Sequence, residues 1–586
     1  MNRVTRTMRV GTGFVVLLAA WAGVSASAIA VEAAVTSPSQ IGSADSPESG
    51  VVASACGLAS EAGCRILQQG GNAVDAAVAV AFAKAVTYPI AGNLGGGGFM
   101  IVRMADGQTT AIDYRETAPG AATRDMYLDE QGEIVPGAST AGYRAVGVPG
   151  TVAGMAMAHA RFGQLAWEDV IEPARQLAAD GFALSEAFID NLNSRRELLG
   201  RFPESKRIFL KDGQGYRVGE RFRQGELADT LARLQRDGWR EFYEGRTARL
   251  IADDMQANGG LITLEDLRNY RPIERVPLRG AYRGYEILTM PPPSSGGAVL
   301  IAMLNMLELF DLNEMEAASA EKYHILIEVM KRAFADRAFH FGDPDFVDVP
   351  VEYLTDKRYA FRRARAIEPG RTTPSELIQP GRLSRSESTE TTHYSVVDAA
   401  GNAVSNTYTL NTNFGSGVTV PGTGILLNNE MDDFTSKIGE PNVFGLIQGV
   451  ANAIEPHKRP LSSMTPTIVE KDGRVVLVLG SPGGPTIINT VLQVLVNVID
   501  HGMALDEAVA APRIHHQWLP DHVRYERQGL PQDVRDALAA MGHAFAPRPS
   551  SRLGDVQAIG IDPTTGTRQG VSDPRSRDGR AIGCGL

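Results

Sequence analysis

The segment SESTETTHYSVVDAAGNAVSNTYTLN, residues 386–411, passes from a polar, hydroxyl-rich stretch directly into an alternating strand pattern. The β-rich runs HYSVVD and NAVSNTYTLN are joined through AAGN, which predicts a β-hairpin with its turn near residue 400. In that register, residues whose numbers sum to about 800 lie opposite each other, so Thr409 is expected across from Thr391. Asn411 then shares the face of Thr409.

Length and composition indicate a globular protein. The 586 residues are 43% hydrophobic, enough to bury a large core in two or three domains, or in one large two-layer domain cut by processing. The formal net charge of −11 argues against nucleic-acid binding, because phosphate recognition normally requires a concentrated positive surface. No nucleic-acid partner is therefore expected.

The N-terminus has the layout of a cleaved secretory signal. Three arginines within the first nine residues precede the apolar run GTGFVVLLAAWAG and the small residues of VSASAIA, so we expect a signal peptide over residues 1–30. A signal anchor is the alternative, although the apolar run is shorter than the roughly 20 residues of a membrane span. The prediction is a periplasmic or secreted protein with no membrane contact after signal removal.

Cysteine and histidine patterns indicate neither a disulfide framework nor a metal site. Cys56 and Cys64 can pair only if no continuous helix joins them, since eight helical steps span about 12 Å. Together with Cys584 they are interpreted as small buried or idle thiols. The ten histidines form no HExxH motif, so no metal and no cofactor is expected.

Three stretches predict helices in the core. Residues 58–71, LASEAGCRILQQGG, read as a helix stopped by its two glycines, and Asn72 is placed to cap a second helix, AVDAAVAVAFAKAV. That second helix is apolar almost all round, so we expect it to be buried. A third helix is predicted by a core-facing stripe of Tyr323, Leu326, Ile327, Met330 and Phe334.

The glycine tract GNLGGGGFM, residues 92–100, lacks the features of a nucleotide-binding loop. It has neither the Lys-Ser/Thr ending of a P-loop nor the spacing of a dinucleotide fingerprint. We interpret it as a tight crossing, a segment that passes close to other parts of the chain because it lacks side chains, in the core or beside the active site.

A second hairpin leads into a candidate oxyanion site. PTIVEKDGRVVLVLG carries the turn signal Asp472-Gly473, and its second strand runs through GSPGG into the apolar helical segment 485–500. A strand, a glycine turn and a helix N-terminus together aim backbone N–H groups at one point, which suits a developing oxyanion. Gly483 and Gly484 are the candidates, with an ordinary strand-to-helix loop as the alternative.

Such a site needs a nucleophile, and the usual ones are missing. The chain has no clean GxSxG elbow and no catalytic cysteine context. A threonine hydroxyl becomes a nucleophile when a base lies beside it, and an N-terminal threonine supplies its own α-amine. Thr391 is internal, so this chemistry requires that the bond between Glu390 and Thr391 be cut.

Eight long segments, in order along the chain, resemble the γ-glutamyltranspeptidases, from about residue 50 to near residue 576. They are GGNAVDAAVA, AGNLGGGGFM, IDYRETAP, TTHYSVVDAAGNAVSNTYTLNTNFGSG, GILLNNEMDDF, KRPLSSMTPTIV, GSPGG and APRIHHQWLP. The resemblance implies an α+β protein with the N-terminal nucleophile hydrolase fold, a four-layer αββα sandwich. It also implies a precursor that cuts itself into a large subunit, 31–390, and a small catalytic subunit, 391–586, which together form one αββα unit.

The resemblance assigns roles to the candidate residues. Thr391 is implied to be both the processing residue, attacking the Glu390 carbonyl, and the catalytic nucleophile, with Thr409 as its hydrogen-bond partner. Gly483 and Gly484 match the oxyanion pair. The implied activities are γ-glutamyl transfer and glutathione hydrolysis, with glutathione and other γ-glutamyl compounds as donors and water, amino acids or peptides as acceptors.

Recognition of a γ-glutamyl head requires groups for both of its charges. The family's set for the α-carboxylate is matched by Arg115, Ser462 and Ser463. Its set for the α-ammonium is matched by Asn411, Glu430 and Asp433. Taken singly, Arg115 would be interpreted as a surface ion-pair partner, the two serines as turn residues and the acids as part of a solvated loop. As a set, they complement one zwitterion.

Two other functions stay open at this point. A cephalosporin or glutaryl-type acylase shares the fold and the processing threonine, but binds an acyl head for which an ammonium-binding acid is dispensable, so Asp433 favours the γ-glutamyl substrate. A processed but silent binding protein is disfavoured by the intact candidate set.

The resemblance has one departure. The segment KIGEPNVFGLIQGV matches a lid with a tyrosine at its tip in well-known bacterial members, and Phe444 stands there instead. Without a phenol hydroxyl, we expect a less well latched lid and faster entry of water.

Overall fold

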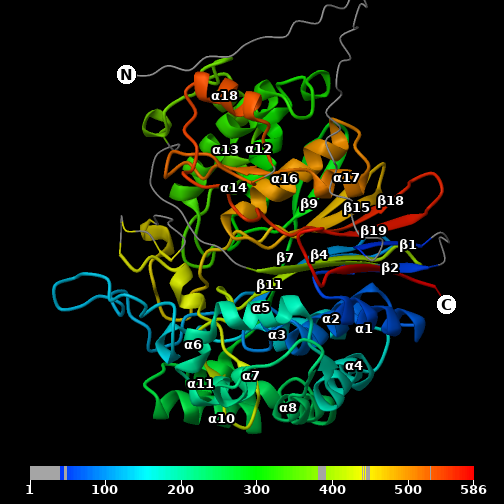
Figure 1. Ribbon diagram of the computed structural model, residues 1–586, viewed down its shortest axis with the longest axis vertical. Coiled ribbons are helices and arrows are strands. Elements are labelled where there is room, and N and C mark those ends of the chain that lie inside the picture. The colour runs from blue at the N-terminus through cyan, green and yellow to red at the C-terminus, as the bar shows by residue number, and fades with distance from the viewer. Residues whose placement is uncertain are drawn as a thin grey trace, which may run out of the picture. The chain divides into compact units, whose positions relative to one another are not determined.

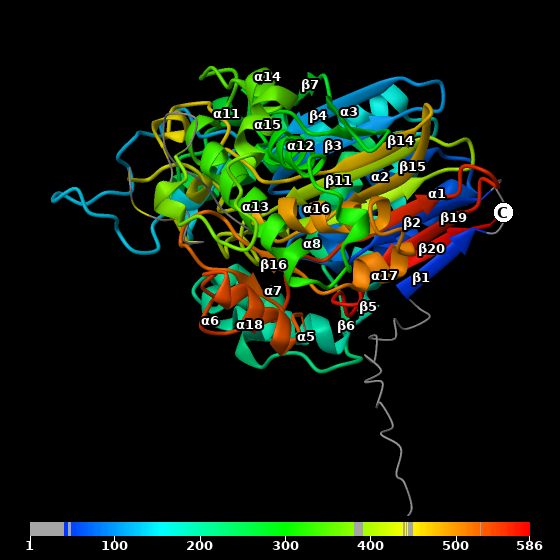
Figure 2. The same cartoon turned by 90° about the horizontal axis from the view of Figure 1, so that it is seen from above.

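The computed structural model describes residues 40–44, 49–379, 391–437, 440, 442–443, 449–527 and 529–585. Two seven-stranded sheets lie face to face, and helices cover the outer face of each (Figure 1). Seen from above, α12, α13 and α16 lie over the strands of one sheet (Figure 2). The predicted four-layer αββα sandwich is confirmed.

The first sheet, called the β10 sheet, contains the predicted threonine hairpin. All its neighbouring strands are antiparallel. Its order is β20 (Arg580–Cys584), β2 (Gly50–Ser54), β10 (Thr392–Val397), β11 (Ala403–Thr409), β3 (Gly97–Arg103), β4 (Thr109–Tyr114) and β7 (Ile273–Arg275).

The second sheet, called the β15 sheet, contains the other predicted hairpin. Its order is β1 (Ile41–Ala44), β19 (Arg568–Ser572), β18 (Gln557–Ile561), β15 (Arg474–Gly480), β14 (Thr467–Lys471), β9 (Tyr285–Thr289) and β8 (Leu278–Tyr282). Asp472 and Gly473 form the β14–β15 turn with φ of 52° and 74°, so this hairpin is confirmed. Short two-stranded pairs are β5 (Phe182–Ala183) with β6 (Arg221–Phe222), β12 (Thr419–Val420) with β13 (Ile425–Leu426), and β16 (Ile514–His515) with β17 (Arg524–Tyr525).

The register of the threonine hairpin is confirmed. Thr392 pairs with Tyr408 and Val397 with Ala403, so paired residues sum to 800 as expected. One step further places Thr391 opposite Thr409, at the end of the hairpin away from the turn. The local turn sequence therefore predicted which two threonines meet.

Alternation along the strands divides the core into layers. Val51 and Ala53 of β2 face the space between the sheets, where Ile468 and Val478 of the β15 sheet meet them. Val52, between them in sequence, packs toward the helices on the outer face. Because successive strand residues point to opposite faces, each sheet supplies one side of the central core and one side of a helical core.

The helices over the β10 sheet begin with the two predicted at the N-terminal side. Asn72 caps α2 in a capping box with Asp75, and every residue of α2 is buried, as predicted. The helices of this half are α1 (Gly57–Gln68), α2 (Ala73–Thr87), α3 (Thr151–Phe162), α4 (Trp167–Asp180), α5 (Glu186–Ser194), α6 (Arg196–Gly200), α7 (Pro203–Leu210), α8 (Gly225–Asp237), α9 (Glu241–Glu244), α10 (Arg246–Ala257) and α11 (Leu264–Asn269).

The helices over the β15 sheet include the predicted helix with the core-facing stripe. That helix is α13, and Leu326, Met330 and Phe334 are fully buried in it. The helices of this half are α12 (Gly296–Leu307), α13 (Ala320–His340), α14 (Val351–Leu354), α15 (Lys357–Ala364), α16 (Pro485–Ile499), α17 (Leu505–Ala510) and α18 (Gln532–Ala540).

Strands from before and after residue 390 interleave within both sheets. In the β10 sheet, β2 lies between β20 and β10, and β3 pairs with β11. In the β15 sheet, β1 and β9 flank strands from the C-terminal part. The two parts of the chain therefore share their cores and form one folding unit.

The interpretation of the cysteines as idle thiols is wrong for two of the three. Cys64 of α1 and Cys584 of β20 form a disulfide, with a Cα–Cα distance of 5.2 Å. Cys56 is a buried free thiol. Sequence spacing failed here because the pairing depends on β20 returning to lie against α1, which places Cys584 beside Cys64 from 520 residues away in sequence.

The predicted signal peptide, residues 1–30, and Glu390 of the predicted processing site lie outside the described residues. Among the helices that the structure does describe, none is long and apolar enough to cross a membrane.

Candidate active site

One cavity brings together nine of the ten predicted catalytic and substrate-binding residues. The side chains that line it contact one another and leave a free volume of only about 10 Å³, so a ligand must displace some of these contacts to enter. The tenth residue, Gly483, directly precedes one of the lining residues. The lining is Arg115, Thr391, Thr409, Asn411, Glu430, Asp433, Ser462, Ser463, Met464, Gly484 and Ile487.

The two threonines lie at one end of the β10 sheet. Thr391 is 8% exposed and Thr409 is 1% exposed. The backbone N–H of Asn411 donates to Thr409 Oγ1 at 2.8 Å, and Asn93 Nδ2 donates to the Thr409 carbonyl at 2.7 Å. These contacts fix the backbone and the hydroxyl of Thr409 beside Thr391.

The glycine tract packs against this end of the sheet. A Cβ on Gly96 would lie 2.0 Å from the Thr409 carbonyl oxygen, and one on Gly95 would lie 2.3 Å from the Leu426 carbonyl oxygen. No side chain fits at either position. The interpretation of the tract as a tight crossing beside the site is confirmed.

The glycine pair forms the turn before α16. Gly483 has φ of 126° and Gly484, at the N-cap, has φ of 57°, both disfavoured for residues with a Cβ. Among the described residues, no acceptor takes the backbone N–H of either glycine. Those N–H groups and the positive end of the helix are therefore available to a negative oxygen.

Arg115 reaches the cavity because of the strand register. Gly98 of β3 pairs with Tyr114, the last residue of β4, so the next residue emerges at the same end as Thr409. The Arg115 side chain is almost fully buried, and Nε and Nη2 donate to the carbonyls of Pro460 and Leu461 at 3.2 and 3.1 Å. These two bonds fix the plane of the guanidinium.

The guanidinium also contacts the two acids predicted to bind an ammonium. Arg115 Nη1 bonds Glu430 and Nη2 bonds Asp433, at the two ends of the short 3₁₀ turn η6 (Glu430–Asp433). The predicted anion-binding and cation-binding groups thus neutralise each other. A zwitterionic ligand is complementary to these groups. Its carboxylate would pair with the guanidinium, and its ammonium would pair with the two acids.

Burial strongly affects the charges here. It raises the pKa of Glu430 and of Asp433 well above that of an ordinary carboxyl group, and the contact with Arg115 offsets only part of this. Burial also raises the pKa of Glu116, 3.6 Å from Arg115, to about 8. Three carboxyl groups surround one guanidinium, so the binding of a second cation at this site is favoured.

Two buried positive side chains next to the site were missed from the sequence. Arg337 of α13 is fully buried, and its Nη2 donates to Ser463 Oγ at 2.7 Å. Lys84 of α2 is also fully buried, and its Nζ donates to Thr392 Oγ1 at 2.5 Å and to the His393 carbonyl at 3.1 Å. The available signal was a charge on a helix face otherwise expected to lie in the core.

Lys84 acts on the residues that follow Thr391. Burial lowers its pKa to about 7, with Cys56 and Asp555 opposing the shift. Its two acceptors are the first residues of β10. Lys84 therefore ties the start of this strand to the helix behind it.

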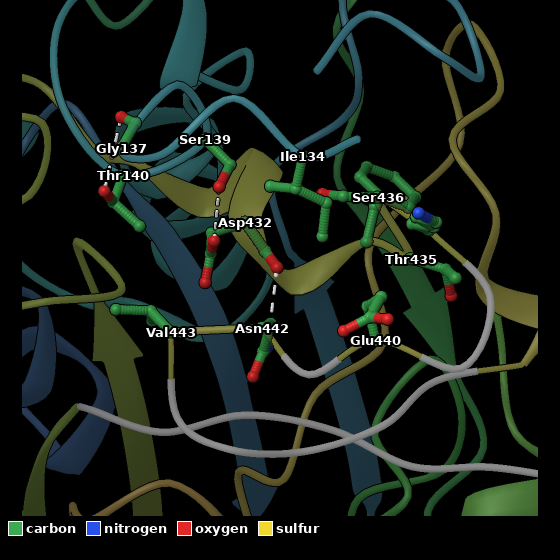
Figure 3. Close-up of a pocket in the computed structure, with 12 residues that line it drawn as sticks. Ile134, Gly137, Ser139, Thr140, Asp432, Thr435, Ser436, Glu440, Asn442 and Val443 are labelled. Carbon is green, nitrogen blue, oxygen red and sulfur yellow. Dashed lines mark hydrogen bonds between the residues drawn. The ribbon is translucent and has the colours of Figure 1, made fainter. Parts of the chain in front are cut away.

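A second pocket adjoins η6 through Asp432, whose neighbour Asp433 lines the first cavity (Figure 3). It has a volume of about 220 Å³ and is lined in part by Ser139, Asp432 and Asn442. Ser139 Oγ donates to Asp432 at 2.6 Å, and burial raises the pKa of Asp432 to about 6. Phe444, the residue of the lid prediction, lies outside the described residues.

Within the described part of the chain, no group of three or more histidine, cysteine or carboxylate side chains is arranged to hold a metal ion.

Comparisons with known proteins agree on one family. Residues 59–583 match Gamma-glutamyltranspeptidase. The chain is 51% identical over 535 residues to the glutathione hydrolase proenzyme of Escherichia coli (strain K12), with 91% of this chain and 92% of that protein covered.

Solved structures agree with this result. The cephalosporin acylase from Bacillus halodurans superimposes with a TM-score of 0.82 at 29% identity, covering 93% of this chain and 97% of that chain. The γ-glutamyltranspeptidase of Helicobacter pylori is 46% identical, with a TM-score of 0.55, covering 56% of this chain and 93% of that chain. The predicted N-terminal nucleophile hydrolase fold is confirmed, and the chain belongs to the γ-glutamyltranspeptidase family.

Proposed function

We propose that this protein is a γ-glutamyltransferase and glutathione hydrolase that uses Thr391 as an N-terminal nucleophile. The observation that carries the proposal is the single cavity that joins Thr391, the glycine turn and charged groups for both ends of a zwitterion. The name of the Escherichia coli relative, a glutathione hydrolase proenzyme, supports both the substrate and the processing.

Maturation creates the catalytic base. Thr391 Oγ attacks the Glu390 carbonyl, the amide bond breaks, and an N-to-O acyl shift leaves an ester and a free α-amine. Water then hydrolyses the ester, giving the Glu390 carboxylate and restoring the Thr391 hydroxyl. The products are a large subunit, 31–390, and a small subunit, 391–586, which stay together because their strands interleave in both sheets.

Catalysis repeats the same attack on a substrate. The α-amine of Thr391 has an ordinary pKa of about 7.7 to 8.0, so a useful fraction is neutral near pH 7.5 and accepts the hydroxyl proton. Oγ attacks the γ-carbonyl carbon, and the N–H groups of Gly483 and Gly484 stabilise the oxyanion. The leaving amine takes the proton, and water or an acceptor amine then cleaves the γ-glutamyl ester.

Binding of the γ-glutamyl head uses the charges around Arg115. The α-carboxylate binds Arg115, with Ser462 and Ser463 as hydroxyl donors, and Arg337 fixes Ser463. The α-ammonium binds Asn411, Glu430 and Asp433. The buried carboxyl groups of Glu430 and Asp433 lose part of their desolvation penalty when a cation arrives.

A leader that directs export places the activity in the periplasm or outside the cell. Donors there would be glutathione and related γ-glutamyl compounds, with water, amino acids or peptides as acceptors.

The acylase function is the second candidate, since the cephalosporin acylase from Bacillus halodurans has the same fold. A glutaryl anilide differs from a γ-glutamyl anilide only by lacking the α-ammonium. It would leave Glu430 and Asp433 without their cation, and a site built around a polar partner strongly rejects an analogue that lacks it.

The test is the ratio of kcat/KM for these two anilides. We expect the γ-glutamyl compound to be preferred by on the order of 10²-fold or more, and Asp433→Asn to reduce that preference. Equal or faster turnover of the glutaryl compound would reject the proposed function in favour of an acylase.

A further inference from the structure

A disulfide joins two parts of the chain that the proposed maturation separates. Cys64 lies in α1, before the processing junction, and Cys584 lies in β20, after it. Eight residues before Cys64, Cys56 precedes α1 and is a free thiol. Cys56 and Cys64, both in the proposed large subunit, are thus about two helical turns apart. The disulfide joins Cys64 to the proposed small subunit.

We infer that the Cys64–Cys584 disulfide is a covalent crosslink between the subunits of the mature enzyme, which therefore remains one molecule after processing. The inference rests on the proposed cut before Thr391. The cut breaks one bond of the chain backbone and leaves the Sγ–Sγ bond intact.

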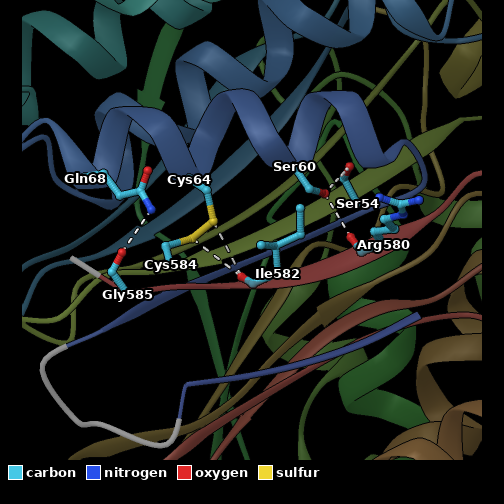
Figure 4. The surroundings of a disulfide bond; sticks show 8 residues. All are labelled: Ser54, Ser60, Cys64, Gln68, Arg580, Ile582, Cys584 and Gly585. Carbon is cyan, nitrogen blue, oxygen red and sulfur yellow. Dashed lines mark hydrogen bonds between the residues drawn. A yellow bond between two sulfur atoms is a disulfide. The ribbon is translucent and has the colours of Figure 1, made fainter. Parts of the chain in front are cut away.

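The surroundings of the disulfide hold its two elements together (Figure 4). Ser60 Oγ donates to the Arg580 carbonyl at 2.8 Å, and Gln68 Nε2 donates to the Gly585 carbonyl at 2.9 Å. These bonds flank the disulfide along α1, so helix and strand are aligned on both sides of it. Backbone pairing of β2 with β20, in which Gly50 lies opposite Cys584, fixes the strand in the sheet. These contacts between α1 and β20 bring the two cysteines together.

The crosslink lies at the opposite end of the β10 sheet from the candidate active site. Gly50, which pairs with Cys584, begins β2, and Ser54 at the other end of β2 pairs with Tyr394, close to Thr391. The sulfur atoms therefore take no part in the catalytic cavity. Loss of the crosslink is expected to affect the association of the subunits and to leave turnover unchanged.

Formation of the bond is a thiol–disulfide exchange. Two thiols lose two hydrogens in total to the disulfide of an oxidoreductase in the exporting compartment, which becomes a dithiol. Once formed, the bond is shielded, because Cys64 is 6% exposed and Cys584 is 4% exposed. Attack by a thiolate requires access to a sulfur atom, so the folded enzyme should resist its own thiol substrate, glutathione.

The direct test is electrophoresis of purified, processed protein, denatured with N-ethylmaleimide to block exchange. Without reductant we expect one band with the mass of both subunits, and with dithiothreitol two bands. Cys584→Ser should give two bands without reductant. The matched variant Cys56→Ser should keep the single band. Two bands from the unreduced wild type, or a crosslink that persists in Cys584→Ser, would overturn the inference.

Failure of the proposed maturation would look different. An uncut protein gives one full-length band with dithiothreitol, as Thr391→Ala should. In that case, a proteolytic peptide pair joining Cys64 to Cys584 still reports the disulfide, while the intersubunit role is rejected.

A second readout is the dependence of the unfolding midpoint on protein concentration. A linked enzyme unfolds as one molecule, so a hundredfold dilution should leave the midpoint unchanged. Cys584→Ser should unfold with dissociation, and its midpoint should fall on dilution while its kcat matches the wild type. A midpoint in the variant that is independent of concentration would contradict the crosslink's proposed effect.

Discussion

The two ends of the β10 sheet differ in what they bury. At the end near Thr391 and Thr409, the structure buries Arg115 among three carboxyl groups and places glycines at positive φ. At the other end, Cys64 and Cys584 form a buried disulfide between α1 and β20. The end that holds the proposed nucleophile therefore accepts groups that are costly to bury, while the covalent crosslink lies at the opposite end of the sheet.

The largest effect on this comparison is expected from Arg115→Met. Without the guanidinium, Glu430 and Asp433 lose their buried cation, and removal of one partner from a buried ion pair typically costs about 3–5 kcal/mol. Activity should be lost and the urea midpoint should fall. Arg161→Met is the matched control, because Arg161 is 47% exposed in a surface pair with Glu274. In this control, the free energy of unfolding should change by only about 0–1 kcal/mol. Equal losses of stability in the two variants would refute the special role of the buried site.

Gly483→Ala should impair catalysis next. The new Cβ would lie 2.3 Å from Thr486 Oγ1 at a φ of 126°, so the turn must shift away from the nucleophile. Loss of one oxyanion donor costs on the order of 10²–10³ in kcat. Gly473→Ala, at φ of 74° with open space around it, should cost about 1 kcal/mol of stability and leave kcat unchanged. An unaltered kcat in Gly483→Ala would remove this glycine from the oxyanion site.

The affinity of the site for the α-ammonium group of the substrate should depend on pH. Burial raises the pKa of Asp433 and Glu430, so protonation begins at higher pH than for ordinary carboxyl groups. Protonated acids cannot pair with the ammonium, so KM for a γ-glutamyl anilide should rise as pH falls. Asp433→Asn should raise KM by roughly 10–100-fold, the value of a hydrogen bond to a charged group, and flatten the pH dependence. A KM for the wild type that is constant with pH would count against these acids as the ammonium site.

Lys84 gives the smallest expected effect. Its pKa of about 7 in the folded protein lies below its ordinary value of 10.5, so between these values the unfolded chain binds more protons. The destabilisation is fully present below pH 7 and fades as pH rises. Relative to Lys84→Met, the wild type should gain about 1 kcal/mol per pH unit between roughly pH 7 and 9. The exposed Lys206→Met controls for loss of one positive charge, and a gain that does not vary with pH would contradict the buried amine.

Local sequence patterns predicted much of this fold. The turn near residue 400 and the turn at Asp472-Gly473 predicted both central hairpins, and the first of them predicted the pairing of Thr391 with Thr409. Capping by Asn72 and the apolar residues on nearly all sides of α2 predicted a buried helix. These predictions succeeded because hairpin registers and helix caps depend on residues close in sequence.

The charged cavity could not be predicted from such patterns. Arg115 and Glu430 are 315 residues apart and meet only after β4 is placed beside β3 in the β10 sheet, so their joint role came from the family resemblance. Arg337 was missed because a helical stripe indicates which face is buried, without indicating that a buried charge contacts Ser463. The Cys64–Cys584 pair was missed because nothing in the spacing of three cysteines shows that the last strand returns to α1.

The most direct test of the central claim is the intact mass and N-terminal sequence of the purified, reduced protein. A chain comprising residues 391–586 and beginning at Thr391 is expected from the wild type, and a single uncut chain from Thr391→Ala. The absence of any chain that begins at Thr391, or cleavage at the same bond in Thr391→Ala, would contradict Thr391 as processing residue and nucleophile.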